Sequence, residues 1–110
     1  MADWDYVLRA DIRTTPLWQF VMEDRRRPDF DSIHQMYYYV AVAYIEDLLQ
    51  QLKGTDTRNL KVQICTSKLV ASQVMGKWRV NDSVLFMLCA KVRALLSEFG
   101  QWEAVCKEGE

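Results

Sequence analysis

The sequence has few of the residues that hold small proteins together by covalent links or metals. Its 110 residues include three cysteines, one histidine, four glycines and two prolines. The cysteines are odd in number, form no CxxC pair and lie in apolar stretches, so we expect reduced thiols and no disulfide framework. A chain of this length buries about two-thirds of its surface on folding and needs no such links. We therefore expect a single domain over residues 1–110 in a reducing, cytoplasmic compartment.

Long hydrophobic runs and a surplus of one charge are also lacking. No apolar stretch approaches the ~18 residues of a membrane span, and the first residues, MADWDYVLRAD, differ from a signal peptide. The 14 Lys and Arg residues balance 15 Asp and Glu residues, for a net charge of -1. These features disfavour a membrane protein and a strong non-specific nucleic-acid binder, so any nucleic-acid contact has to be local.

Three kinds of functional centre are poorly supported. The single histidine, His34, has no cysteine or carboxylate at metal-ligand spacing, which disfavours a zinc site and a Ser/His/Asp triad. No glycine-rich phosphate loop is present either, because the four glycines stand at expected helix ends or in the tail. Nucleotide-loop chemistry is therefore excluded.

Hydrophobic periodicity and turn residues predict an α/β fold with the order β-β-α-β-α-α-β. Residues 4–12 and 17–22 are expected to form a hairpin split by Thr14-Thr15-Pro16, and the charged segment 23–31 a loop. Further along, we expect a helix over 32–53 ended by Gly54, a strand over 60–65 and a short helix over 67–75 ended by Gly76. A longer helix capped by Asn81 or Asp82 should reach residue 97, followed by an edge strand over 101–106 and a frayed end.

One stretch carries a more specific pattern. Residues 64–78 read ICTSKLVASQVMGKW, and Val80-Asn81-Asp82 and a long amphipathic helix follow. This resembles the ribonuclease H family, in which a strand leads into an Asp-Ser cap and a short helix ending in a Gln-Val-x-Gly-x-Trp run. The resemblance is clearest over residues 60–99. Upstream, YYYVAV at 37–42 resembles the family's first helix, and VLRAD at 7–11 the strand that carries its first aspartate.

The resemblance implies a ribonuclease H-like mixed sheet flanked by helices, with the family's C-terminal helix missing. It also implies cleavage of the RNA strand of RNA–DNA hybrids by two magnesium ions about 4 Å apart, held by carboxylates. Asp11 matches the first of these carboxylates. Tyr38 stands where the family has a glutamate, Thr66 where it has a second aspartate, and the last acidic ligand belongs to a helix beyond Glu110.

Three of the four implied ligands are therefore missing, and nearby acids do not replace them. Glu46 lies about 12 Å along the helix from Tyr38, beyond the reach of a shared metal ion. Magnesium prefers charged oxygen ligands, and Tyr38 and Thr66 offer neutral ones. We expect no metal cofactor and a catalytically inactive domain, a pseudoenzyme, in which the ring of Tyr38 packs where metal and water would sit.

A binding role survives the loss of the metals. The resemblance implies contacts with a duplex backbone near the strand–helix turns, and the residues that form this patch are Ser67, Lys68, Lys77, Trp78 and Arg79. In the alternative view Trp78 fills the core, and the cations are solvated surface residues that bind nothing. The arginines at 25–27 are flanked by acids and are better explained as a solvated loop. Among Tyr37, Tyr38 and Tyr39, at least one should be exposed, because consecutive helical residues point in different directions.

Together these features predict an inactive ribonuclease H-like domain that acts as a binding or assembly module. Its expected partner is a protein or a second copy of the chain, and an RNA–DNA hybrid or another duplex is the further candidate. One alternative is an active, magnesium-dependent ribonuclease H whose missing ligands come from a partner chain or from a shifted alignment. Another is an unrelated α/β scaffold in which the motif match is accidental.

Overall fold

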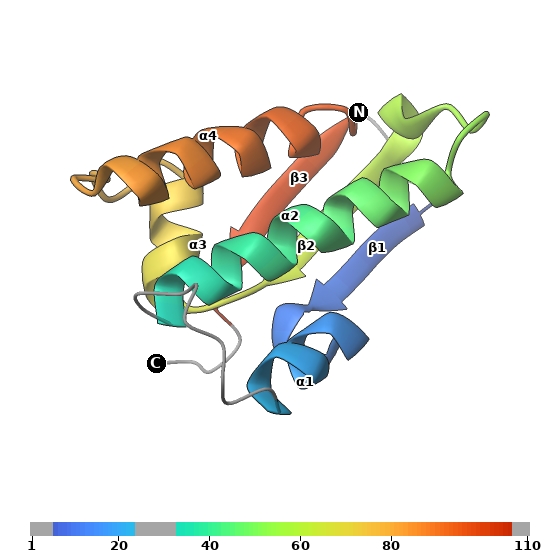
Figure 1. The fold of residues 1–110 in the computed structure, drawn as a ribbon. Coiled ribbons are helices and arrows are strands. Elements are labelled where there is room, and N and C mark those ends of the chain that lie inside the picture. Colours follow the sequence, from blue (N-terminus) through green and yellow to red (C-terminus); the bar gives the residue numbers. More distant parts are fainter. Residues whose placement is uncertain (1–5, 24–32, 107–110) are drawn as a thin grey trace.

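The computed structural model describes residues 6–23 and 33–106. Three strands and four helices follow one another in the order β1 (Tyr6–Asp11), α1 (Pro16–Glu23), α2 (Ile33–Gln51), β2 (Leu60–Cys65), α3 (Lys68–Val74), α4 (Ser83–Leu96) and β3 (Gln101–Val105). Short 3-10 turns, Ile12–Thr14 and Thr57–Asn59, follow β1 and precede β2. Figure 1 shows α2 and α4 lying side by side in front of the sheet.

The three strands form one parallel sheet in the order β1-β2-β3. Parallel neighbours cannot be joined by a tight turn, and here helices make both connections. Along β2 buried residues alternate with half-buried ones, so Val62 and Ile64 face the helices while Gln63 and Cys65 face the other way. The register pairs Ala10 with Ile64, which extends the helix-facing side onto β1.

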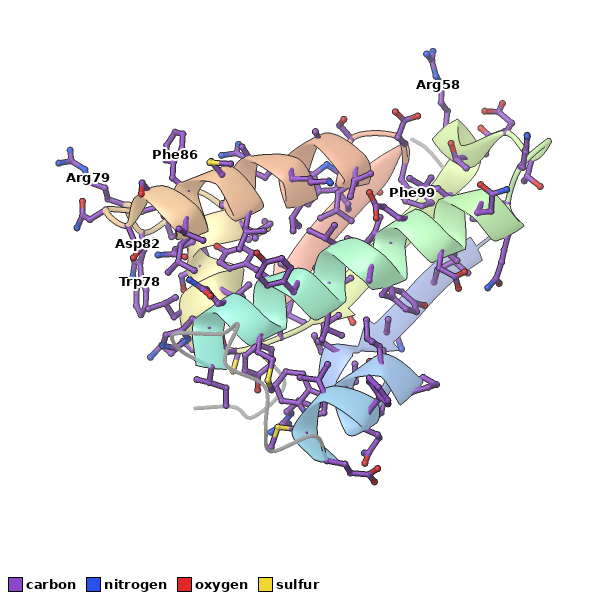
Figure 2. All side chains as sticks on the ribbon, viewed as in Figure 1. Arg58, Trp78, Arg79, Asp82, Phe86 and Phe99 are labelled. Carbon is purple, nitrogen blue, oxygen red and sulfur yellow. The ribbon has the colours of Figure 1, made fainter. Side chains whose placement is uncertain are left out.

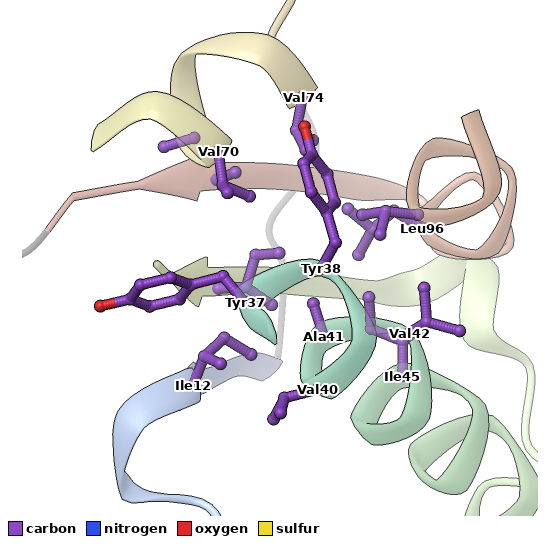
Figure 3. Close-up of a cluster of buried hydrophobic side chains, with 14 of the residues drawn as sticks. Ile12, Tyr37, Tyr38, Val40, Ala41, Val42, Ile45, Val70, Val74 and Leu96 are labelled. Atoms are coloured by element: carbon purple, nitrogen blue, oxygen red, sulfur yellow. The ribbon is translucent and has the colours of Figure 1, made fainter. Parts of the chain in front are cut away.

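The hydrophobic core lies between the sheet and the helices. Its largest side chains without exposed surface come from β2, α2, α3, α4 and the turn after β1, and they are Tyr38, Ile12, Ile45, Ile64, Leu96, Val40, Val62, Val70, Val74 and Val92. Figure 3 shows that α2 supplies the centre of this cluster. The opposite face of the sheet carries polar side chains, and none of the described helices covers it.

The predicted hairpin is wrong, because residues 17–22 belong to the helix α1 and not to a second strand. The Thr15 hydroxyl accepts a hydrogen bond from the Trp18 main-chain N–H at 3.2 Å, as an N-cap does. Pro16 is the first helical residue, where its fixed φ and missing N–H cost nothing. The buried Trp18 ring lies 4.5 Å from that of Tyr37, between centroids. Thr-Pro therefore starts a helix here rather than a turn between strands.

The element order is accordingly β-α-α-β-α-α-β, not β-β-α-β-α-α-β, and the sheet is parallel, not mixed, in the part of the chain that the structure describes. The predicted α/β class is confirmed, as are the strand over 60–65 and a last strand at the sheet edge. The charged loop is outside the described residues from position 24 on, including the arginines at 25–27. Trp4 and the expected frayed end also lie outside them.

The predicted helix boundaries after β1 agree with the structure to within two residues. The Ser67 hydroxyl accepts from the Val70 N–H and caps α3, and the Asp82 carboxylate accepts from the Leu85 N–H and caps α4. Gly76 follows α3 with a φ of 81°, a conformation that L side chains rarely adopt. Cys65, Cys89 and Cys106 form no disulfide within the described residues. Among the described helices, none is long and apolar enough to cross a membrane.

Candidate functional site

Tyr38, at the position matched to the family's glutamate, is completely buried on α2. Its hydroxyl donates a hydrogen bond of 2.7 Å to the side-chain oxygen Oε1 of Gln73 on α3. Figure 3 shows the ring of Tyr38 extending towards Val74 and away from Ile12, which follows β1. Burial raises the pKa of Tyr38, and the neighbouring Cys89 thiol raises it further. Tyr38 therefore stays a neutral phenol within the core.

Asp11, at the position matched to the family's first aspartate, is the last residue of β1 and keeps only 17 % of its side-chain surface exposed. Its carboxylate oxygen Oδ1 accepts from the Arg13 main-chain N–H at 3.0 Å and lies 3.9 Å from the Arg13 Nε. It borders a hollow of about 330 Å³ that Arg9, Gln63 and Cys65 also line. These residues share the sheet face turned away from α2. The structure therefore places Asp11 and Tyr38 on opposite faces of the sheet.

Thr66, at the position matched to the second aspartate, joins β2 to α3 and is 7 % exposed. Its main-chain N–H donates to the carbonyl of Val105 at 2.9 Å, which continues the pairing of β2 with β3. Its hydroxyl oxygen is buried and has no hydrogen-bond partner among the described residues. A neutral, buried hydroxyl is a weak ligand for a hard divalent cation.

The residues at these three positions do not fit a pair of magnesium ions. They offer one carboxylate, one phenol whose proton is already donated to Gln73, and one alcohol. A two-metal clamp needs several anionic oxygens around one point, to offset four positive charges. Within residues 6–23 and 33–106, no three His, Cys, Asp or Glu side chains are grouped to hold a metal ion.

The residues of the predicted phosphate patch divide between two surfaces. Lys68 and Lys77 are exposed and line a hollow of about 270 Å³ between α3 and the end of β3. Ser67 lies at the start of α3, and its hydroxyl accepts from the Val70 N–H at 3.2 Å. Because α3 has only seven residues and its cap is occupied by Ser67, the cations rather than the helix end are the groups that can attract an anion.

Trp78 and Arg79 lie on the second surface, in the connection between α3 and α4. Trp78 is 45 % exposed, so the alternative in which it fills the core is wrong. Both residues line a groove of about 410 Å³, together with Phe86 and Arg93 of α4. Figure 2 shows Trp78, Arg79 and Phe86 at the end of the molecule where α4 begins, with Arg58 at the opposite end. We call this hollow the α4 groove.

Three residues of these sites were absent from the sequence prediction. Gln73 is buried beneath Tyr38, and its signal was a single amide on the otherwise apolar side of the short helix, between Val70 and Val74. Phe86 is exposed, and its signal was a large apolar residue outside the helical phase of the core positions of α4. Arg93 follows Phe86 by seven residues, so both lie on one side of α4.

Tyr39 and His34, which the sequence also singles out, both lie on α2. Tyr39 is exposed while Tyr37 and Tyr38 are buried, which confirms that the three cannot all enter the core. His34 is half-buried in the first turn of α2, and its Nδ1 has no hydrogen-bond partner among the described residues.

A solved structure similar to this chain is the crystal structure of RNase H1 from the halophilic archaeon Halobacterium salinarum NRC-1. The sequences are 28% identical and the TM-score is 0.51. The match covers 66% of this chain and 53% of that protein, so this chain spans about half the length of the relative. Neither the models of protein families nor the curated proteins gave a match. The fold is therefore ribonuclease H-like, as the motif over residues 60–99 predicted.

Proposed function

We propose that this chain is a catalytically silent domain of the ribonuclease H-like fold that binds a nucleic-acid duplex. The absence of catalysis is supported by Tyr38, which stands where the family resemblance implies a glutamate. Its side chain is buried, and its hydroxyl donates a hydrogen bond to Gln73. A carboxylate at that position would lie in the apolar core, at a cost that only a nearby cation could offset. Asp11, on the other face of the sheet, cannot share a metal ion with it.

The proposed duplex binding is supported by cations in the segment that carries the family motif. Lys68, Lys77 and Arg79 are exposed and form no ion pair within the described part of the chain. Such groups attract phosphates without reading sequence, and their contribution depends on salt. The net charge of -1 limits this attraction to the local patch. An RNA–DNA hybrid is the first duplex to test, because the fold is shared with a protein named RNase H1.

The test is a fluorescence anisotropy titration of a labelled RNA–DNA hybrid, with a chelator present, at several salt concentrations. The unmodified chain should bind, and the double variant Lys77→Ala with Arg79→Ala should bind more weakly. The affinity of the unmodified chain should fall as salt rises. Removing two phosphate contacts should make this dependence shallower, reducing the magnitude of the slope of log affinity against log salt by about 1.8. The matched control is Arg58→Ala, which removes an exposed arginine at the far end of the molecule (Figure 2).

Two results would contradict the duplex proposal. The first is absence of hybrid binding by the unmodified chain at low salt, where electrostatic contacts are strongest. The second is binding with the same salt slope in the double variant and in the Arg58→Ala control, which would place the phosphate contacts elsewhere.

A further inference from the structure

The α4 groove has an apolar, aromatic lining at the surface. Trp78 and Phe86 border it with 45 % and 61 % of their surface exposed, and Val80 and Ala90 lie beside them. Exposed aromatic side chains next to a hollow are typical of sites where another molecule docks, since tryptophan and arginine dominate binding energies. The groove is about 410 Å³ in volume, enough for one or two peptide side chains.

Two arginines give the groove a positive charge. Arg79 and Arg93 line it and are exposed, and neither forms an ion pair with any residue in the ranges 6–23 and 33–106. The neighbouring Lys91 differs, because its Nζ lies 3.5 Å from Oε2 of Glu46. The nearest acid along the chain, Asp82, caps α4 through the Leu85 N–H and forms no ion pair with either arginine. The charge of the two arginines is therefore available to an anionic partner.

The bottom of the groove can accommodate an apolar group. It is formed by Gln73 and Cys89, which are both buried. The side-chain oxygen of Gln73 accepts from Tyr38, and its main-chain oxygen accepts from the Cys89 thiol at 3.6 Å. Because these oxygens and the thiol are bonded within the protein, an aliphatic or aromatic side chain that enters the groove leaves none of them newly unpaired.

We propose that the α4 groove binds an acidic peptide segment of a partner protein. An apolar side chain of the leucine or phenylalanine kind enters between Trp78 and Phe86, and carboxylates of the same segment pair with Arg79 and Arg93. Charge complementarity and the apolar lining together select this partner over a neutral or basic one. Peptide binding in this groove and the proposed duplex binding share Arg79, but Lys68 and Lys77 line a different hollow, so the two proposals can be tested apart.

The test begins with selection of short random peptides displayed on phage against the immobilised chain. The selected peptides should combine Asp or Glu with Leu, Phe or Trp, and the strongest is then synthesised with a fluorescent label. Phe86→Ala and Arg93→Glu should each weaken its binding about tenfold. Met87→Ala, next to Phe86 but outside the groove, and Arg58→Glu, at the far end of the molecule, are the controls and should change binding less than about twofold.

The changed side chains are exposed, so the variants should fold, and circular dichroism checks this. Three results would each overturn the proposal: failure to select any peptide, selection of peptides without acidic residues, or unchanged peptide affinity in Phe86→Ala and Arg93→Glu relative to the unmodified chain. A labelled single-stranded DNA is titrated in parallel. If that DNA binds and loses affinity in the same two variants, the groove is a nucleic-acid site instead. Hybrid binding by Lys77→Ala reports separately on the duplex proposal, because Lys77 does not line the α4 groove.

Discussion

Removal of the Tyr38 hydroxyl should destabilise the fold, because the hydrogen bond to Gln73 is buried. In Tyr38→Phe the side-chain oxygen of Gln73 loses its hydrogen-bond donor. The phenylalanine ring has no donor to replace it, and the position is completely buried. A buried acceptor left without a partner costs about 1–3 kcal/mol. A domain of this size is stable by about 5–15 kcal/mol, so the change removes a measurable share of the free energy of unfolding.

Equilibrium unfolding in urea measures this cost. A loss of about 2 kcal/mol should lower the midpoint by about 1 M urea with an unchanged slope. Tyr44→Phe is the matched control, because it removes the same atom from a half-buried tyrosine whose hydroxyl has no hydrogen bond within the described part of the chain. That control should change stability by less than about 0.5 kcal/mol.

A variant of Gln73 tests whether Tyr38 and Gln73 act as a pair. Gln73→Met replaces the amide with an apolar group of similar shape, so combining it with Tyr38→Phe should cost less than the sum of the two single changes. The expected coupling is about 1 kcal/mol. Equal midpoints for Tyr38→Phe and the unmodified chain would refute the reasoning, since they would mean that the Tyr38 hydroxyl meets water rather than Gln73.

The pKa of Tyr38, the cap of α4 and the exposure of the cysteines can each be tested separately. The pKa of Tyr38 is raised in the folded state, so its contribution to stability is complete below the unfolded pKa of 10.0 and is lost as the pH rises above it. Above that pH the free energy of unfolding should fall by about 1.4 kcal/mol per pH unit. The fall should be less steep in Tyr38→Phe, and urea unfolding at several alkaline pH values measures it. Asp82→Ala should cost about 1 kcal/mol in urea unfolding, because it removes the N-cap of α4. A thiol reagent should modify Cys65 and Cys106 before Cys89, which is buried, and mass spectrometry of the labelled peptides distinguishes them.

Much of the fold after residue 33 could be predicted from local signals. The alternation over residues 60–65, the caps Ser67 and Asp82, and the glycines after α2 and α3 each specify an element without reference to the rest of the chain. The segment at 17–22 is apolar in almost every position, so its period does not separate strand from helix. Thr15 and Pro16 make this segment a helix, because Thr15 caps α1 and Pro16 is its first residue.

The candidate site was less predictable than the fold. A match of motifs places Asp11, Tyr38 and Thr66 along the chain, but the facing of Asp11 depends on its register with Cys65 in the sheet. One residue of register moves a side chain to the other face, and no local pattern in VLRAD determines it. The division of the cations between two hollows likewise depends on how the connection after α3 folds back, which periodicity does not report.

We propose that the ribonuclease H-like fold carries no ligand set for catalytic metals in the part of this chain that the structure describes. Incubation of a labelled RNA–DNA hybrid with the purified chain, in magnesium and in manganese, tests it most directly. We predict an uncut RNA strand with the unmodified chain and with Asp11→Asn alike. Metal-dependent cleavage by the unmodified chain that disappears in Asp11→Asn would contradict the account and make the chain an active nuclease.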